Sequence, residues 1–148
     1  MRGATTWLAL ACSAARAADV VETCAWNVHE ATCAGPRAYY DEVVTLDTHL
    51  RSVGAPPAEG HSAMCPRAVA HMRAVARAAA ETSQLVRVCE VGFNAGHSAL
   101  NWLAADPRTA VDAFDLGAHP SAAAAFAYLS KKYPGRLRLT LGLSLIHI

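Results

Sequence analysis

The residues best suited to chemistry lie in one short stretch, Val88–Ser98, where an apolar run ends in a carboxylate and a glycine turn follows. Glu90, Gly92 and Gly96 are spaced as E-x-G-x-N-x-G, with Asn94 between the two glycines. In an open parallel sheet, such a turn between a strand and a helix binds a nucleotide-like cofactor at the carboxyl end of the strand. The spacing does not match the dinucleotide fingerprint G-x-G-x-x-G.

Each glycine of this turn has an expected physical task. We expect Gly92 to reverse the chain at a positive φ, and Gly96 to let the backbone approach a ligand closely, because glycine has no Cβ. The helix that follows would point free N–H groups at an anionic part of the ligand, with His97 at its start as a binding contact. The alternative is a tight turn between a strand and a helix that binds nothing.

A second carboxylate favours the cofactor interpretation. Residues 110–116 are expected to form another strand, and Asp115 near its end follows Gly96 by 19 residues. A carboxylate about 20 residues after a glycine turn accepts hydrogen bonds from ribose hydroxyls. Asp112 fits this role less well because it falls in the middle of the strand.

The pattern resembles the first two motifs of class I S-adenosylmethionine-dependent methyltransferases, and within them the small O-methyltransferase branch. Glu90, Gly92 and Gly96 occupy defining positions of the first motif, and Asn94 is a departure that the family commonly shows. The resemblance implies S-adenosylmethionine as cofactor and a small-molecule substrate, for which a hydroxyl acceptor is one candidate. The cofactor-binding residues that it implies are Glu90, Gly92, Phe93, Asn94, Gly96, His97, Ser98 and Asp115. It assigns no catalytic residue and no metal ligand to this chain.

Two other functions stay open on the sequence. One is a non-catalytic, methyltransferase-like domain that only binds the cofactor. The other is a different Rossmann-like enzyme that uses a nicotinamide or another nucleotide. No Ser-His-Asp or Cys-His nucleophile arrangement is predicted from the spacing of these residues.

Periodicity and turn residues place this chemistry in an α/β fold. We predict strands at 88–91, 110–116 and 137–141, and helices at 36–53, 65–79, 98–105 and 120–133. The alternation of strands and helices is typical of a doubly wound parallel sheet. Residues 61–142 would form its first half, an incomplete doubly wound sheet with three strands, preceded by N-terminal helices.

The N-terminus resembles a secretory signal peptide over residues 1–18, with Ala15-Arg16-Ala17 as the cleavage pattern. This predicts the secretory pathway or an extracellular location; an organellar or a cytoplasmic protein is the alternative. Cleavage would leave an extension, 19–60, in which an oxidising compartment permits a disulfide between Cys24 and Cys33. A zinc site that includes these cysteines and His29 is a weaker alternative without a clear fourth ligand.

The last six residues, 143–148, differ in composition from the rest of the chain. Both isoleucines lie there, whereas arginine outnumbers lysine eleven to two in the whole chain, as in a GC-rich coding sequence. The hexapeptide also resembles a translated sequencing-library adapter. We therefore expect a non-native tail and an inactive N-terminal part of a methyltransferase, because half of a doubly wound sheet completes only half of a ligand crevice.

The overall composition excludes several partners. The formal net charge is +1 and the basic residues are scattered, so no nucleic-acid partner is expected. No long apolar run outside alanine-rich helices predicts a membrane span. The sequence gives no indication of oligomeric state. Cys89, inside the first predicted strand, is expected to pack as a buried thiol.

Overall fold

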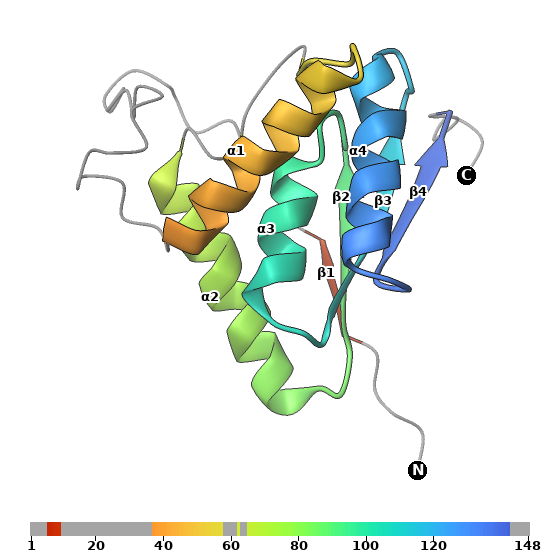
Figure 1. Cartoon of the computed structure of the whole chain (residues 1–148). Helices are drawn as coiled ribbons and strands as arrows, with labels where there is room; N and C mark the ends of the chain where they lie inside the picture. The colour runs from red at the N-terminus through yellow and green to blue at the C-terminus, as the bar shows by residue number, and fades with distance from the viewer. Residues whose placement is uncertain (1–5, 10–36, 58–61, 63–64, 143–148) are drawn as a thin grey trace, which may run out of the picture.

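The computed structural model describes residues 6–9, 37–57, 62 and 65–142 (Figure 1). Its elements are β1 (Thr6–Ala9), α1 (Arg37–Ser52), α2 (Pro66–Thr82), β2 (Val86–Val91), α3 (His97–Ala105), β3 (Thr109–Asp115), α4 (Pro120–Lys132) and β4 (Leu137–Leu141). The three predicted strands and the helices between them are confirmed, with starting residues that differ by at most two positions.

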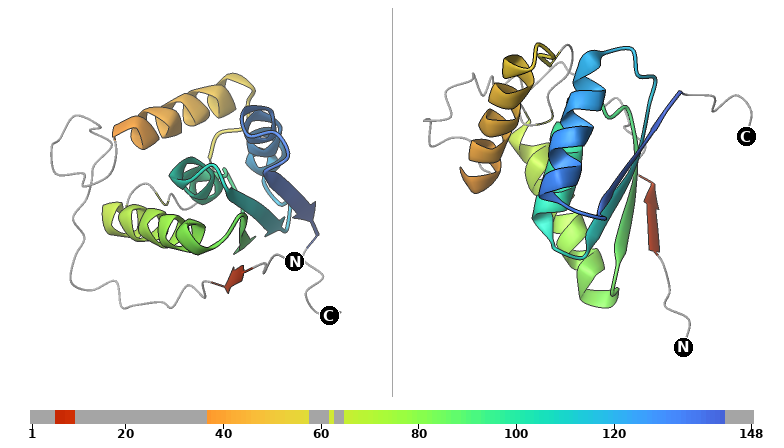
Figure 2. Two further views of the ribbon diagram at one scale, coloured as in Figure 1. Left: turned by 90° about the horizontal axis from the view of Figure 1, so that it is seen from below. Right: turned by 45° about the vertical axis from the view of Figure 1, so that its right-hand side comes forward.

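The strands form one parallel sheet in the order β1-β2-β3-β4. The four helices lie together on one face of this sheet (Figure 2). Sequential parallel strands with crossover helices on the same face make up one half of a doubly wound fold. The predicted fold class is therefore confirmed. Because the strands are parallel, β2 and β3 end at the same edge, and Glu90 pairs in register with Ala113 of β3.

Strand β1 was not predicted from the sequence. It pairs in parallel with β2, with Thr6 opposite Val86 and Ala9 opposite Cys89. This short strand falls within residues 1–18, for which the sequence predicts removal as a signal peptide. That cleavage stays a prediction, and its expected site at Ala15-Arg16-Ala17 lies outside the described residues.

One hydrophobic core joins the helices to the sheet, and α1 belongs to it. Tyr39, Val43, Leu46 and Leu50 follow helical spacing along α1 and are all buried. They share a continuous cluster with Leu100 and Leu103 of α3, Leu129 of α4, and Val88 and Val111 of the sheet. Burying each such side chain contributes about 1.5–3 kcal/mol. Part of the predicted extension, helix α1, thus packs directly on α4 and on α3, the helix that follows the glycine turn.

The opposite face of the sheet carries charged side chains. Asp112 of β3 accepts a hydrogen bond from Arg87 of β2 at 2.8 Å and another from Arg138 of β4. These two arginines hold the pKa of Asp112 below its usual value, the contact with Arg138 contributing most. Cys89 on β2 is only half-buried, whereas the sequence predicted a buried thiol. Alternation along β3 therefore places Asp112 and Asp115 on different faces.

Several sequence predictions concern residues outside the described ranges: Cys24, His29, Cys33 and the tail 143–148. In the parts of the chain that the structure describes, no helix has both the length and the apolar character that a bilayer crossing requires.

Candidate functional site

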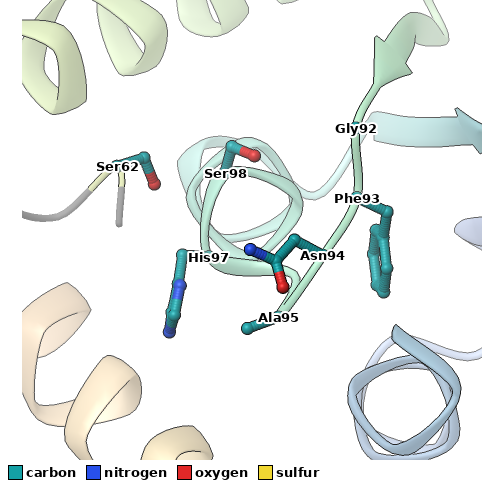
Figure 3. Close-up of a pocket in the computed structure, with 7 residues that line it drawn as sticks. All are labelled: Ser62, Gly92, Phe93, Asn94, Ala95, His97 and Ser98. Atoms are coloured by element: carbon teal, nitrogen blue, oxygen red, sulfur yellow. The ribbon is translucent and has the colours of Figure 1, made fainter. Parts of the chain in front are cut away.

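A hollow of about 270 Å³ lies where the glycine turn meets the start of α3 (Figure 3). Its lining residues are Ser62, Gly92, Phe93, Asn94, Ala95, His97 and Ser98. Five of these were among the residues predicted from the sequence to bind a cofactor. Ser62, which comes from the segment before α2, and Ala95 were not. The hollow therefore lies at the carboxyl edge of the parallel sheet, where open α/β sheets bind their ligands.

The turn uses left-handed backbone conformations at three positions. Gly92 has φ 87°, Asn94 has φ 45° and Gly96 has φ 74°. The predicted positive φ of Gly92 is confirmed. Asparagine is among the few residues other than glycine that adopt such a conformation readily, which explains why Asn94 fits between the two glycines.

Gly96 has a different task from the one expected. A Cβ at this position would lie 2.8 Å from Cδ1 of Leu129 and 3.0 Å from Cζ of Phe93. Those atoms belong to the core between α3 and α4, so the missing Cβ permits close helix packing and not the approach of a ligand. At Gly92, by contrast, an added Cβ would meet no atom within 4 Å.

Asp115, at the end of β3, ties two loops together. Its Oδ2 accepts a hydrogen bond from the Asn94 N–H at 2.8 Å, and its Oδ1 accepts one from the Gly117 N–H at 2.7 Å. Ser121 of α4 donates to the Asn94 side-chain oxygen at 3.1 Å. An ionised carboxylate offers about four acceptor positions, so these two bonds leave capacity for further donors. The predicted ribose-binding carboxylate thus lies directly beside the glycine turn.

Glu90 lies behind the hollow, linked to it through Ser98. The Ser98 hydroxyl donates a hydrogen bond to Oε1 of Glu90. The other carboxyl oxygen, Oε2, is buried and has no hydrogen-bond partner, and the residue is 9% exposed. Burial raises the pKa of Glu90 to about 7; the Ser98 hydrogen bond opposes this shift, and the nearby Asp115 charge adds to it. Glu90 itself does not line the hollow, but its neighbour Ser98 does. A buried acceptor without a partner is costly, and next to a hollow it indicates a place for a ligand's donor.

His97, the first residue of α3, is held from α1. Its Nε2 lies 2.6 Å from Oδ1 of Asp47, and both residues are 4% exposed. The Tyr39 hydroxyl donates to the His97 carbonyl oxygen at 3.2 Å. Burial raises the pKa of Tyr39 to about 12, so this hydroxyl keeps its proton. Asp47 and Tyr39 were not predicted as part of the site.

The remaining predicted residues contribute backbone or packing. Phe93 is 2% exposed and belongs to the core, and Figure 3 shows its ring directed away from the other lining side chains. Helix α3 begins at His97, and its N-cap residue, Gly96, has no side chain that could cap it with a hydrogen bond. Its first N–H groups are therefore suited to an anionic group of a ligand. Within the described ranges, no group of three His, Cys, Asp or Glu side chains is arranged to hold a metal ion.

The site consequently combines a glycine turn, an uncapped helix start, an orphaned carboxyl oxygen and a second carboxylate at one edge of a parallel sheet. Such an arrangement suits a ligand with an ammonium group, a carboxylate and vicinal hydroxyls. Comparisons of this chain with protein-family models, with curated proteins and with solved structures found no match.

Proposed function

We propose that this chain binds S-adenosylmethionine at the glycine turn 92–98 and Asp115, as the cofactor-binding part of a methyltransferase that acts on a small molecule. One observation carries the proposal: Asp115 at the end of β3 is hydrogen-bonded to Asn94 in the turn that follows β2. This contact brings the carboxylate expected to bind ribose to the turn expected to bind the methionine end.

The residues at the turn fit the amino-acid end of the cofactor. The orphaned Oε2 of Glu90 would accept a hydrogen bond from the ammonium group. The uncapped start of α3 would receive the carboxylate, because its N–H groups and the helix dipole favour negative charge. A pyrophosphate carries no ammonium group, so the orphaned carboxyl oxygen favours an amino-acid-containing cofactor over a dinucleotide.

The strand order supports the same placement. Strands β4, β3 and β2 correspond to the order 3-2-1 of one half of a doubly wound sheet, in which the ligand lies outside the carboxyl ends of the strands. Asp115 on β3 would then accept hydrogen bonds from the ribose hydroxyls through the lone pairs that the Asn94 and Gly117 amides do not use.

The cofactor supplies an already activated methyl group on its sulfonium. The task of the chain's own residues is therefore to hold and orient it, and positioning of this kind accounts for a large part of catalysis in two-substrate reactions. Glu90, Ser98 and the start of α3 would fix the amino-acid end. Asp115 would fix the ribose.

Calorimetric titration of the full 148-residue chain with S-adenosylhomocysteine and with NAD tests this proposal. We expect saturable binding of S-adenosylhomocysteine and none of NAD. Incubation with methyl-labelled S-adenosylmethionine and a panel of small hydroxyl compounds then tests for transfer. Binding of NAD without binding of S-adenosylhomocysteine would overturn the proposal and favour a different Rossmann-like protein.

A further inference from the structure

Helix α1 is joined to the start of α3 by a buried polar contact that packing alone does not require. Asp47 on α1 and His97 on α3 are 50 residues apart in sequence, and their Oδ1 and Nε2 atoms lie 2.6 Å apart. Their side chains are 6% and 4% exposed. Replacing both partners of a buried hydrogen bond by apolar groups of the same shape is often nearly neutral or stabilising, so this contact is weak evidence for a purely structural role.

The same helix also holds the His97 backbone. The Tyr39 hydroxyl donates to the His97 carbonyl oxygen, and Tyr39 and Asp47 are both buried on α1. Eight residues separate them, a little over two helical turns, which puts both on the face that packs on the core. The ring and the peptide of His97 are thus fixed from one rigid element.

His97 is the residue from which the ligand-facing end of α3 begins. It lines the hollow together with Ser98, and Ser98 in turn contacts Glu90 with its orphaned oxygen. A displacement of His97 would therefore redirect the first N–H groups of α3 and move Ser98 relative to Glu90.

We infer that Asp47 is a positioning residue for the ligand: through His97 it sets the start of α3 for the amino-acid end of the cofactor, and it has no effect on the nucleoside end. The inference rests on the proposed function for the identity of the ligand. Asp47 itself does not line the hollow. Its effect is thus expected only for ligands that carry an amino acid.

The test compares two ligands that differ in that group. S-adenosylhomocysteine carries the amino acid, whereas 5′-methylthioadenosine keeps the nucleoside and the sulfur without it. In the full chain, Asp47→Asn is expected to weaken the binding of S-adenosylhomocysteine by about tenfold, which is the scale of a lost charge-assisted hydrogen bond. The affinity for 5′-methylthioadenosine should stay within about twofold of that of the unmodified chain. His97→Gln is expected to show the same selectivity, and the double variant should lose little more than either single one.

The matched control is Glu42→Gln. Glu42 is another carboxylate of α1, and it contacts Tyr133 at 2.9 Å and Lys132 at 3.2 Å instead of His97. This substitution removes contacts between α1 and α4. The affinities for both ligands should therefore equal those of the unmodified chain. His97→Gln keeps the test decisive if Asp47→Asn does not fold.

The outcomes separate the two proposals. If the unmodified chain binds neither ligand, the proposed function fails. If it binds S-adenosylhomocysteine, but the Asp47 and His97 variants lose no affinity or lose both ligands equally, the positioning role is overturned and the proposed function stands.

Discussion

The carboxylate of Asp115 and the backbone N–H of Asn94 are joined by a 2.8 Å hydrogen bond that spans 21 residues of sequence. Because Asp115 also accepts from Gly117, the turns that follow β2 and β3 are held as one unit. A ligand at this edge of the sheet would meet two loops that are already in place, which lowers the ordering cost of binding.

Removing this carboxylate should affect both stability and binding. Asp115→Ala leaves two backbone N–H donors without their acceptor, and we expect the free energy of unfolding in urea to fall by about 1–3 kcal/mol. Affinity for S-adenosylhomocysteine, measured by calorimetry, should fall by a similar free energy. Asp112→Ala is the matched control on the opposite face of the same strand, and it should leave that affinity unchanged. Equal affinity in the Asp115 variant would remove this residue from the site.

The two glycines of the turn should respond differently to alanine. Gly96→Ala combines a positive φ with a Cβ 2.8 Å from Leu129, so we expect a loss of about 3 kcal/mol in urea unfolding. Gly92→Ala meets no atom within 4 Å and should lose only about 1 kcal/mol, from its backbone conformation. Equal losses at the two positions would contradict the packing role of Gly96.

Glu90 should make stability depend on pH. The folded-state pKa of about 7 lies above the ordinary value of 4.5, so the folded protein keeps a proton that the unfolded chain releases. The stability that this protonated carboxyl contributes is fully present below pH 4.5 and is lost as the pH rises through about 7. The loss amounts to about 3 kcal/mol.

Urea unfolding at a series of pH values measures this effect, with Glu90→Gln as the reference because its amide does not titrate. The unmodified chain should lose stability relative to the variant between pH 4.5 and pH 7. A constant difference across that range would show that the Glu90 pKa is not raised.

Arg136 should matter more to stability than its neighbour Arg138. Its guanidinium donates to the carbonyl oxygens of Thr109, Leu103 and Asp106 at 2.6–2.8 Å, which satisfies acceptors at the end of α3 and the start of β3. We expect Arg136→Ala to reduce the free energy of unfolding by about 2 kcal/mol. Arg138→Ala should have a much smaller effect, since the Arg138 side chain is 67% exposed. Comparable losses would contradict this capping role.

The strands and helices from β2 to β4 were predictable because the signals that define them are local in sequence. Each element is indicated by a signal of only a few residues. These signals are glycines at positive φ in turns, a proline at the start of α4 and alternating leucines in β4. The placement of Asp115 beside the turn also followed, because consecutive parallel strands end at one edge of a sheet.

Long-range contacts escaped prediction for a physical reason. Asp47 follows Leu46 on a helix whose apolar stripe also includes Val43 and Leu50, and a carboxylate beside such a stripe indicates a buried partner without identifying it. His97 became that partner only once α1 packed on α3. The packing role of Gly96 likewise depends on Leu129, 33 residues further along the chain.

Strand β1 could not be predicted from the sequence for a different reason, which is its short length. A four-residue strand carries little periodicity, and Thr6–Ala9 also fits the apolar part of a signal peptide. In the structure it pairs with the edge of β2 that faces away from β3. In the doubly wound order 3-2-1-4, that edge pairs with the first strand of the second half, which explains why it accepts a parallel strand.

The most direct test of the central claim is to locate bound ligand on the chain itself. In ¹⁵N-labelled full chain titrated with S-adenosylhomocysteine, backbone amide shifts report which residues contact the ligand. We predict that the largest changes cluster at 92–98 and 115–117, with little change at Arg87, Asp112 and Arg138 on the opposite face of the sheet. No shift at saturating ligand, or changes centred away from the glycine turn, would contradict the assignment of this turn as an S-adenosylmethionine site.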